Sequence, residues 1–288
     1  MCGVYSAGAI PEDQAMSIKT VLVHVDPGPG CNPRVQLAMH VADLFDADLI
    51  GLGAEAFDPV FVSGYAATDG VVIEAIQERI AADLPAAEKH FRALTSGRER
   101  IAWVKGVDYP DKLLALNARG ADLIVASRPA RGESPIFAAR LADTIMEAGV
   151  PVLLAATTGA AFQGDRIVVA WKDTRESRRA LGDALPFLKR AKAVVVVAVC
   201  GEADTKSGQA GAADVARRLA AHGVEASVEV VAKGKATVAE VLEDVARRHS
   251  ADLIVAGAYG HSRLREWALG GVTEDFLASC PQFVLLSH

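Results

Sequence analysis

A six-residue segment occurs twice in this chain, and the repeat constrains the fold more than any other feature. Ala-Asp-Leu-Ile-Val-Ala spans residues 121–126 and again 251–256, so the copies lie 130 residues apart. Pro151 has a counterpart at Pro281, at the same separation. A chain of 288 residues is long enough for two domains that each bury a core. The repeat therefore predicts one fold that has been duplicated.

Short apolar runs alternate with stretches of helical period in both copies. The run at 20–25 is continuous, as in a parallel strand covered on both faces. Strands are expected at 20–25, 48–52, 100–104, 122–126 and 152–155, then at 166–171, 193–199, 225–231, 252–256 and 283–286. Helices are expected at 33–45, 71–95, 110–119 and 136–148, then at 175–190, 210–222, 236–249 and 267–279, with a connection at 201–211. This alternation predicts an α/β, Rossmann-like protein with two doubly wound five-stranded parallel-sheet domains of strand order 3-2-1-4-5.

The small-residue stretch 157–164 is the expected boundary between the copies. It separates a domain at 17–156 from a domain at 165–288, and residues 1–16 are expected to form an N-terminal extension.

Composition argues against several classes of function. The formal net charge of −6 disfavours nucleic acid as a partner. The apolar run at 193–200 is too short to span a bilayer, so no membrane association is expected. The four cysteines, Cys2, Cys31, Cys200 and Cys280, have no CxxC spacing and are expected to be reduced. Without a secretion signal at the N-terminus, these features predict a cytoplasmic protein.

The second copy alone has glycines where a phosphate could bind. Gly257 and Gly260 follow the repeated segment, and Gly270 and Gly271 precede Val272 and Thr273. Glycine lets backbone N–H groups approach an anion, and a helix N-terminus adds unpaired donors. The first copy has Ser127, Ala130, Arg140 and Leu141 at the four glycine positions, so its crevice, beside Asp26, is expected to be closed or to take another ligand.

Asp173 follows the first strand of the second copy. In a sheet of order 3-2-1-4-5, ligands bind beyond the carboxyl ends of strands 1 and 4, so Asp173 and Gly257 are expected to line one crevice. Asp173 and Glu176 also have the spacing of a helix capping box, and the two roles are compatible. Gly257 and Gly260 have the alternative interpretation of simple turn glycines.

With these residues in place, the chain resembles a tandem universal stress protein over residues 17–288. The family's G-x2-G-x9-G-(S/T) loop is matched by Gly257, Gly260 and Gly270, and its strand-1 aspartate by Asp173. Gly271 replaces the family's Ser or Thr, which removes one hydroxyl contact to phosphate. The resemblance also implies that the two domains pack through their last strands, 151–155 and 282–286, about a pseudo-twofold axis, as an intramolecular pseudo-dimer.

The resemblance implies that the second domain binds ATP, or ADP or AMP, in a sensing or regulatory role in stress response. No catalytic base is identified, so at most slow ATP hydrolysis is expected; Mg²⁺ would accompany ATP, although the residues indicate no metal site. One alternative is an interaction module that binds no nucleotide. Another is a small-ligand protein that binds beneath the connection at 54–70. Protein partners and homo-oligomerisation stay open.

Overall fold

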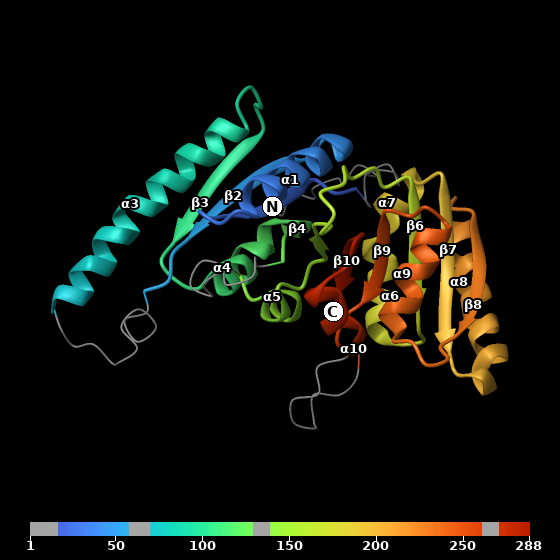
Figure 1. Ribbon diagram of the computed structural model, residues 1–288. Coiled ribbons are helices and arrows are strands. Elements are labelled where there is room, and N and C mark those ends of the chain that lie inside the picture. The colour runs from blue at the N-terminus through green and yellow to red at the C-terminus, as the bar shows by residue number, and fades with distance from the viewer. Residues whose placement is uncertain (1–16, 58–69, 129–138, 261–270) are drawn as a thin grey trace, which may run out of the picture.

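The computed structural model describes residues 17–57, 70–128, 139–260 and 271–288 (Figure 1). Within these residues ten strands form a single sheet in the order β3-β2-β1-β4-β5-β10-β9-β6-β7-β8. The strands are β1 (Thr20–Val25), β2 (Asp48–Ala54), β3 (Ile101–Gly106), β4 (Leu123–Ala126), β5 (Val152–Leu154), β6 (Arg166–Trp171), β7 (Ala193–Cys200), β8 (Ala226–Ala232), β9 (Leu253–Gly257) and β10 (Phe283–Ser287). The predicted α/β class and the order 3-2-1-4-5 in each half are confirmed.

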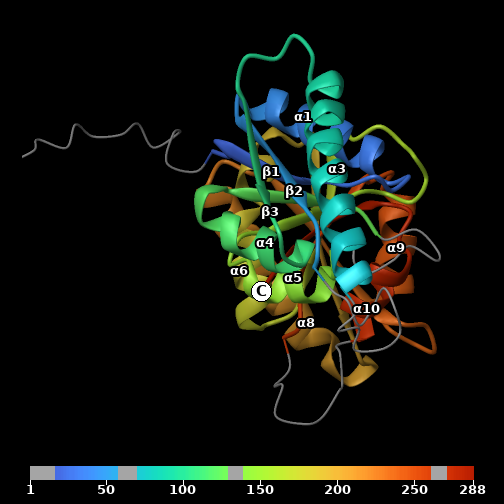
Figure 2. The ribbon, with the colours of Figure 1, turned by 90° about the vertical axis from the view of Figure 1, so that its left-hand side faces the viewer.

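Helices cover both faces of this sheet (Figures 1 and 2). They are α1 (Cys31–Phe45), α3 (Gly70–Leu94), α4 (Pro110–Asn117), α5 (Leu141–Glu147), α6 (Arg175–Asp183), α7 (Leu185–Arg190), α8 (Thr205–Ala221), α9 (Val238–Arg248) and α10 (Gly271–Ala278), with 3-10 turns η1 (Ala118–Gly120) and η2 (Glu202–Asp204). Successive residues of a strand pack into the hydrophobic cores on opposite faces of the sheet. Val21 and Val23 pack on the α1 side, and Leu22 packs on the α4 side. This two-sided burial explains the continuous apolar runs.

The two halves join through their last strands. β5 and β10 are antiparallel, with Leu153 opposite Leu285, whereas the other strand pairs are parallel. Both leucines are fully buried in the same core. The predicted packing of 151–155 against 282–286 is therefore confirmed, and the core on each face continues from one half into the other.

The duplicated aspartates, Asp122 and Asp252, bind corresponding backbone segments in the two halves. The Asp122 carboxylate accepts hydrogen bonds from the backbone N–H groups of Lys19 and Thr20, at 2.8 and 2.9 Å. The Asp252 carboxylate accepts from those of Gln163 and Gly164, at 2.7 and 2.9 Å. Each aspartate thus fixes the chain that enters the first strand of its half, which explains part of the sequence repeat in structural terms.

Three predicted helices differ from the structure. The helix expected at 175–190 is divided at Ala184, because Pro186 lacks the N–H that a continuous helix needs. The helix expected at 136–148 begins at Leu141; residues 136–138 lie outside the described residues, and Arg140 has an extended backbone.

The expectation of a connection at 201–211 is also wrong, because α8 begins at Thr205. The glycines of this segment lie where α8 approaches the sheet. A Cβ at Gly208 would lie 3.2 Å from the Cys200 sulfur, and one at Gly211 would lie 3.1 Å from Trp171 Nε1. Close packing, rather than a turn, explains these glycines.

In the described part of the chain, no helix combines the length and apolar character that crossing a membrane requires.

A charge at the seam between β5 and β10 should destabilise the whole protein. We expect Leu285→Asp to lower the free energy of unfolding by about 3–5 kcal/mol, because the site offers no partner for a buried charge. Leu116→Asp is the control, since Leu116 is 54% exposed and should tolerate the change. Urea unfolding followed by circular dichroism measures both, and equal losses for the two variants would contradict the importance of the seam.

Candidate functional site

The carboxyl ends of β6 and β9 meet at one edge of the sheet. The two strands are parallel neighbours, with Val169 opposite Val255. Beyond β6 the chain continues through Asp173 into α6, and beyond β9 it continues through Gly257 to Gly260. β6 lies between β9 and β7, so this is the position where ligands bind in doubly wound sheets.

Helix α6 begins one residue later than the predicted capping box requires. Thr174 is the N-cap, and its side-chain oxygen accepts a hydrogen bond from Ser177 N at 3.3 Å. The assignment of Asp173 as the capping residue is therefore wrong. The Asp173 carboxylate instead forms an ion pair with Arg178, and its side chain is 74% exposed. This exposure leaves Asp173 accessible to a ligand.

Gly257 and Gly260 permit a close approach between the β9 loop and α6. A Cβ at Gly257 would lie 2.5 Å from Ser177 N, and one at Gly260 would lie 2.8 Å from Glu176 Oε2. Among the described loop residues 257–260, Tyr259 has a positive φ, at 59°. The glycines are thus required by packing as well as by any ligand, and the left-handed residue is not a glycine.

Glu176 places a buried carboxylate beside Gly260. Burial favours its neutral form, but hydrogen bonds from its own backbone N–H and from Arg175 outweigh this effect and lower the pKa of Glu176. The Arg175 contact is 3.0 Å, between Nε and Oε1. An anion bound at the loop would therefore face a negative charge that Arg175 partly neutralises.

The other side of the loop is closed by α10. Thr273 is buried, and its hydroxyl oxygen accepts a hydrogen bond from Tyr259 N at 3.4 Å. Gly271 is exposed, and a Cβ there would meet nothing within 4 Å. Val272 packs against the core on the α9 side. The structure thus brings Thr273 to the β9 loop, whereas Gly270 lies outside the described residues.

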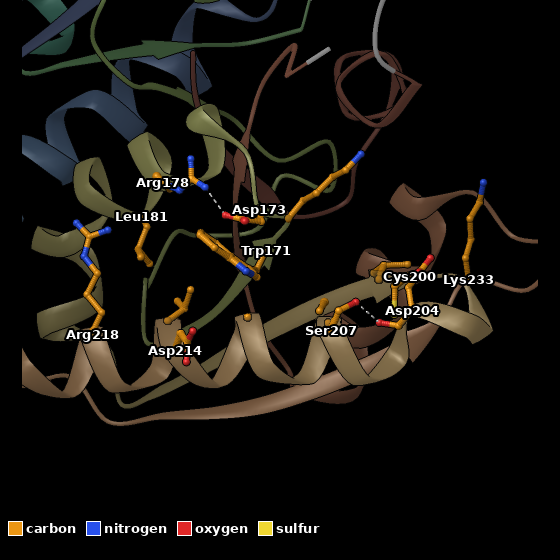
Figure 3. Close-up of a pocket in the computed structure, with 17 residues that line it drawn as sticks. Trp171, Asp173, Arg178, Leu181, Cys200, Asp204, Ser207, Asp214, Arg218 and Lys233 are labelled. Carbon is orange, nitrogen blue, oxygen red and sulfur yellow. Dashed lines mark hydrogen bonds and ion pairs between the residues drawn. The ribbon is translucent and has the colours of Figure 1, made fainter.

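A cavity of about 750 Å³ opens on the far side of Asp173 (Figure 3). One wall is formed by the ends of β6 and β7, and the other by α8. The indole of Trp171 lies between Asp173 and α8, and Leu181 and Val215 add apolar surface. Charged groups line it too: Asp173, Asp204, Asp214, Arg178, Arg218, Lys172 and Lys233.

The sequence interpretation missed this cavity, because it assigned 201–211 to a connection. The sequence did contain a signal for a helix here. Residues 204, 208, 211 and 214 follow one another at intervals of three or four, which is the spacing of one helix face. The described residues that line the cavity include Asp173 but not Gly257, Gly260 or Thr273. Asp173 thus lines the cavity, and the next residue, Thr174, lies close to Gly260.

In the N-terminal half an arginine bridges the corresponding strand ends. Arg34 of α1 donates to the Asp26 carboxylate, to His24 O at 2.8 Å and to Ser127 Oγ at 2.6 Å. Burial favours neutral Asp26, but the hydrogen bond with His24 and the charge of Arg34 lower its pKa to about 2. This network bridges the ends of β1 and β4. Asp26 also lines a cavity, so both expected outcomes, a closed crevice and one that takes another ligand, stay predictions.

Arg140 does not take part in that network. Its guanidinium donates to the buried carboxylate of Asp111 in α4 at 2.9 Å and pairs with Asp143. A cavity of about 440 Å³, lined in part by Asp26, lies between the loop after β1 and α3, where Asn32 Oδ1 is 2.6 Å from His90 Nε2. The connection at 54–70 is described only to residue 57 and at residue 70, so the predicted small-ligand site beneath it lies largely outside the described residues.

The two glycine positions should respond differently to alanine. We expect Gly257→Ala to cost about 1–3 kcal/mol of unfolding free energy, because the new methyl group collides with the backbone of α6. Gly271→Ala should change stability by less than about 0.5 kcal/mol, because the space there is open. Urea unfolding of both variants is the measurement, and an unaffected Gly257→Ala protein would refute the packing role.

Comparisons with known proteins give a family for the C-terminal half. The model of the universal stress protein family matches residues 164–288. A search of curated proteins found no match. A universal stress protein from Archaeoglobus fulgidus DSM 4304 superposes with a TM-score of 0.69 at 14% identity, over 93% of this chain and 97% of that chain. A functionally unknown protein from Pseudomonas aeruginosa PAO1 gives 0.58 at 15% identity, over 96% and 94%. At these identities the solved structures establish the fold, and the family match shows that residues 164–288 carry a universal stress protein domain.

Proposed function

We propose that the C-terminal half binds one molecule of ATP, or of ADP or AMP, and that the protein uses this nucleotide for sensing or regulation in stress response. The observation that carries the proposal is the position of Asp173, which lines an open cavity and immediately precedes Thr174, beside Gly260. A nucleotide needs both features, a loop that binds its phosphates and a cavity that holds its base.

The loop side suits the phosphates. The first backbone N–H groups of a helix such as α10 have no partner within the helix and carry partial positive charge, which stabilises an anion. The Thr273 hydroxyl oxygen already accepts from Tyr259 N, and no described acceptor takes its proton. That proton can be donated to a phosphate oxygen. Gly260 lets this loop lie close to Glu176 and Thr174, which a side chain at that position would meet.

The cavity side suits the base and the ribose. Its volume of about 750 Å³ lies within the range of small-molecule sites. The Trp171 indole offers a flat apolar surface on which an aromatic base can stack. The Asp173 carboxylate accepts hydrogen bonds from base or ribose, and binding would rearrange its ion pair with Arg178.

The proposed role is sensing rather than turnover. Glu176 is the carboxylate nearest to Gly260, but it is buried and already bonded to Arg175. Within the described residues no group of three or more His, Cys, Asp or Glu side chains could hold a metal ion. In this proposal Mg²⁺ arrives with ATP and is coordinated mainly by the phosphates. We assign no catalytic residue.

One observation favours an interaction module that binds no nucleotide. The negative charge of Glu176 beside Gly260 opposes a bound phosphate, and Gly271 offers no hydroxyl where the family has one. In this second candidate function the C-terminal half would bind a protein partner without a nucleotide.

Calorimetric titration of the intact chain with ATP separates the two functions. We expect saturable binding that Asp173→Ala weakens about tenfold, which corresponds to one lost hydrogen bond to a charged group. Gly260→Val should abolish binding, because its side chain would meet Glu176 and Thr174 and push the loop away from α6. Trp171 fluorescence should change as ATP binds.

Asp165→Ala is the matched control. Asp165 also forms an ion pair, with Lys192, but it precedes β6 and lies at the opposite end of that strand. Its replacement should leave ATP affinity unchanged. Absence of binding to the wild-type protein would favour the interaction module. Equal affinity of the wild-type and Asp173→Ala proteins would remove Asp173 from the site.

A further inference from the structure

A side chain from the N-terminal half reaches the helix that ends the glycine loop. Arg128 follows β4, and its Nε donates to Phe276 O in α10 at 2.7 Å. Its Nη1 donates to Ala155 O, just beyond β5. The guanidinium thus joins α10 to the backbone on the N-terminal side of the seam between β5 and β10.

Arg128 binds α10 at the end where a cation is most favourable. Phe276 lies in the last turn of this helix, whose carbonyl groups have no partner within the helix. The same turn carries the negative end of the helix dipole. One positive side chain therefore satisfies an unpaired carbonyl and stabilises the charge distribution of the helix.

The opposite end of α10 belongs to the proposed nucleotide site. Gly271 and Thr273 lie in its first turn, and Thr273 is bonded to the backbone of Tyr259. Eight residues of α-helix span only about 12 Å, so the helix moves as one rigid body. Any shift at Phe276 therefore changes the position of Thr273 relative to the β9 loop.

The surroundings of Arg128 indicate more than a surface contact. Burial lowers the pKa of Arg128, although the group stays charged, and Glu243 of α9 and Cys280 act against this effect. Its Nη2 is buried and has no hydrogen-bond partner among the described residues. A buried donor without a partner costs stability, so packing alone would favour an apolar side chain here.

We propose that Arg128 is a positioning residue for the nucleotide site, through which the N-terminal half sets the affinity of the C-terminal half for ATP. This inference rests on the proposed function. Arg128 holds α10 where its first turn can bind phosphate. Linkage requires the reverse effect as well, so bound nucleotide strengthens the contact with Arg128 and the order of the neighbouring N-terminal backbone. The N-terminal half thereby regulates the C-terminal half.

The test compares ATP affinity in three full-length proteins by calorimetry: wild type, Arg128→Met and Arg98→Met. Arg98 is the matched control, because it also donates to a backbone carbonyl, Ala47 O at 3.0 Å, and has a buried Nε without a described partner. We expect Arg128→Met to bind ATP about tenfold more weakly, a coupling of ordinary size. Arg98→Met should bind as tightly as the wild type, whatever its stability.

Hydrogen exchange of the wild-type protein provides a second readout that a purely structural role would not change. Saturating ATP should slow amide exchange in 123–128 and 152–155, within the N-terminal half. The same protection should be absent in Arg128→Met at equal ATP saturation. The comparison of wild-type protein with and without ATP needs no variant. It therefore tests the inference even if Arg128→Met fails to fold.

Two results would overturn the inference while leaving the proposed function in place. One is unchanged ATP affinity in folded Arg128→Met, with any loss confined to thermal stability. The other is wild-type protection by ATP that stops at the seam and never enters the N-terminal half. Absence of ATP binding to the wild-type protein is a different result, because it refutes the proposed function itself and the inference with it.

Discussion

The antiparallel pairing of β5 with β10 is the contact on which the rest of this structure depends. Each five-stranded half would otherwise expose the edge of its last strand, and such edges pair readily with other chains. Pairing within one chain satisfies both edges and merges the cores on the two faces of the sheet. It also fixes the end of β4 beside α10, which is the geometry that lets Arg128 contact Phe276.

Most of the fold could be predicted from the sequence, because its signals are local. The uninterrupted apolar run at 20–25 indicates a strand buried on both faces, and the structure has β1 there. The start of α8 could not be predicted in the same way. Gly208 and Gly211 indicate a turn when the neighbouring sheet is unknown, whereas in the fold they let the helix approach Cys200 and Trp171.

The sequence predicted which residues meet at the candidate site, but not the contacts that hold them there. Sequence placed Asp173 and Gly257 at neighbouring strand ends, and the strand order confirms that placement. It could not show that Gly257 is required by the backbone of α6, since that contact spans 80 residues. The sequence pointed to Arg140 as the residue that fills the N-terminal crevice, whereas Arg34 bridges the ends of β1 and β4 by bonding to Asp26 and Ser127. Arg34 carries no motif, so only the fold reveals its role.

The central claim is an asymmetry: one half binds a nucleotide, and the other half does not. Native mass spectrometry of the intact chain with ATP added tests it directly, because it counts ligands per molecule. The account predicts a single species heavier by one adenine nucleotide, with no second addition as ATP rises to saturation. A chain that takes up two equivalent nucleotides, or none at any ATP concentration, would contradict it.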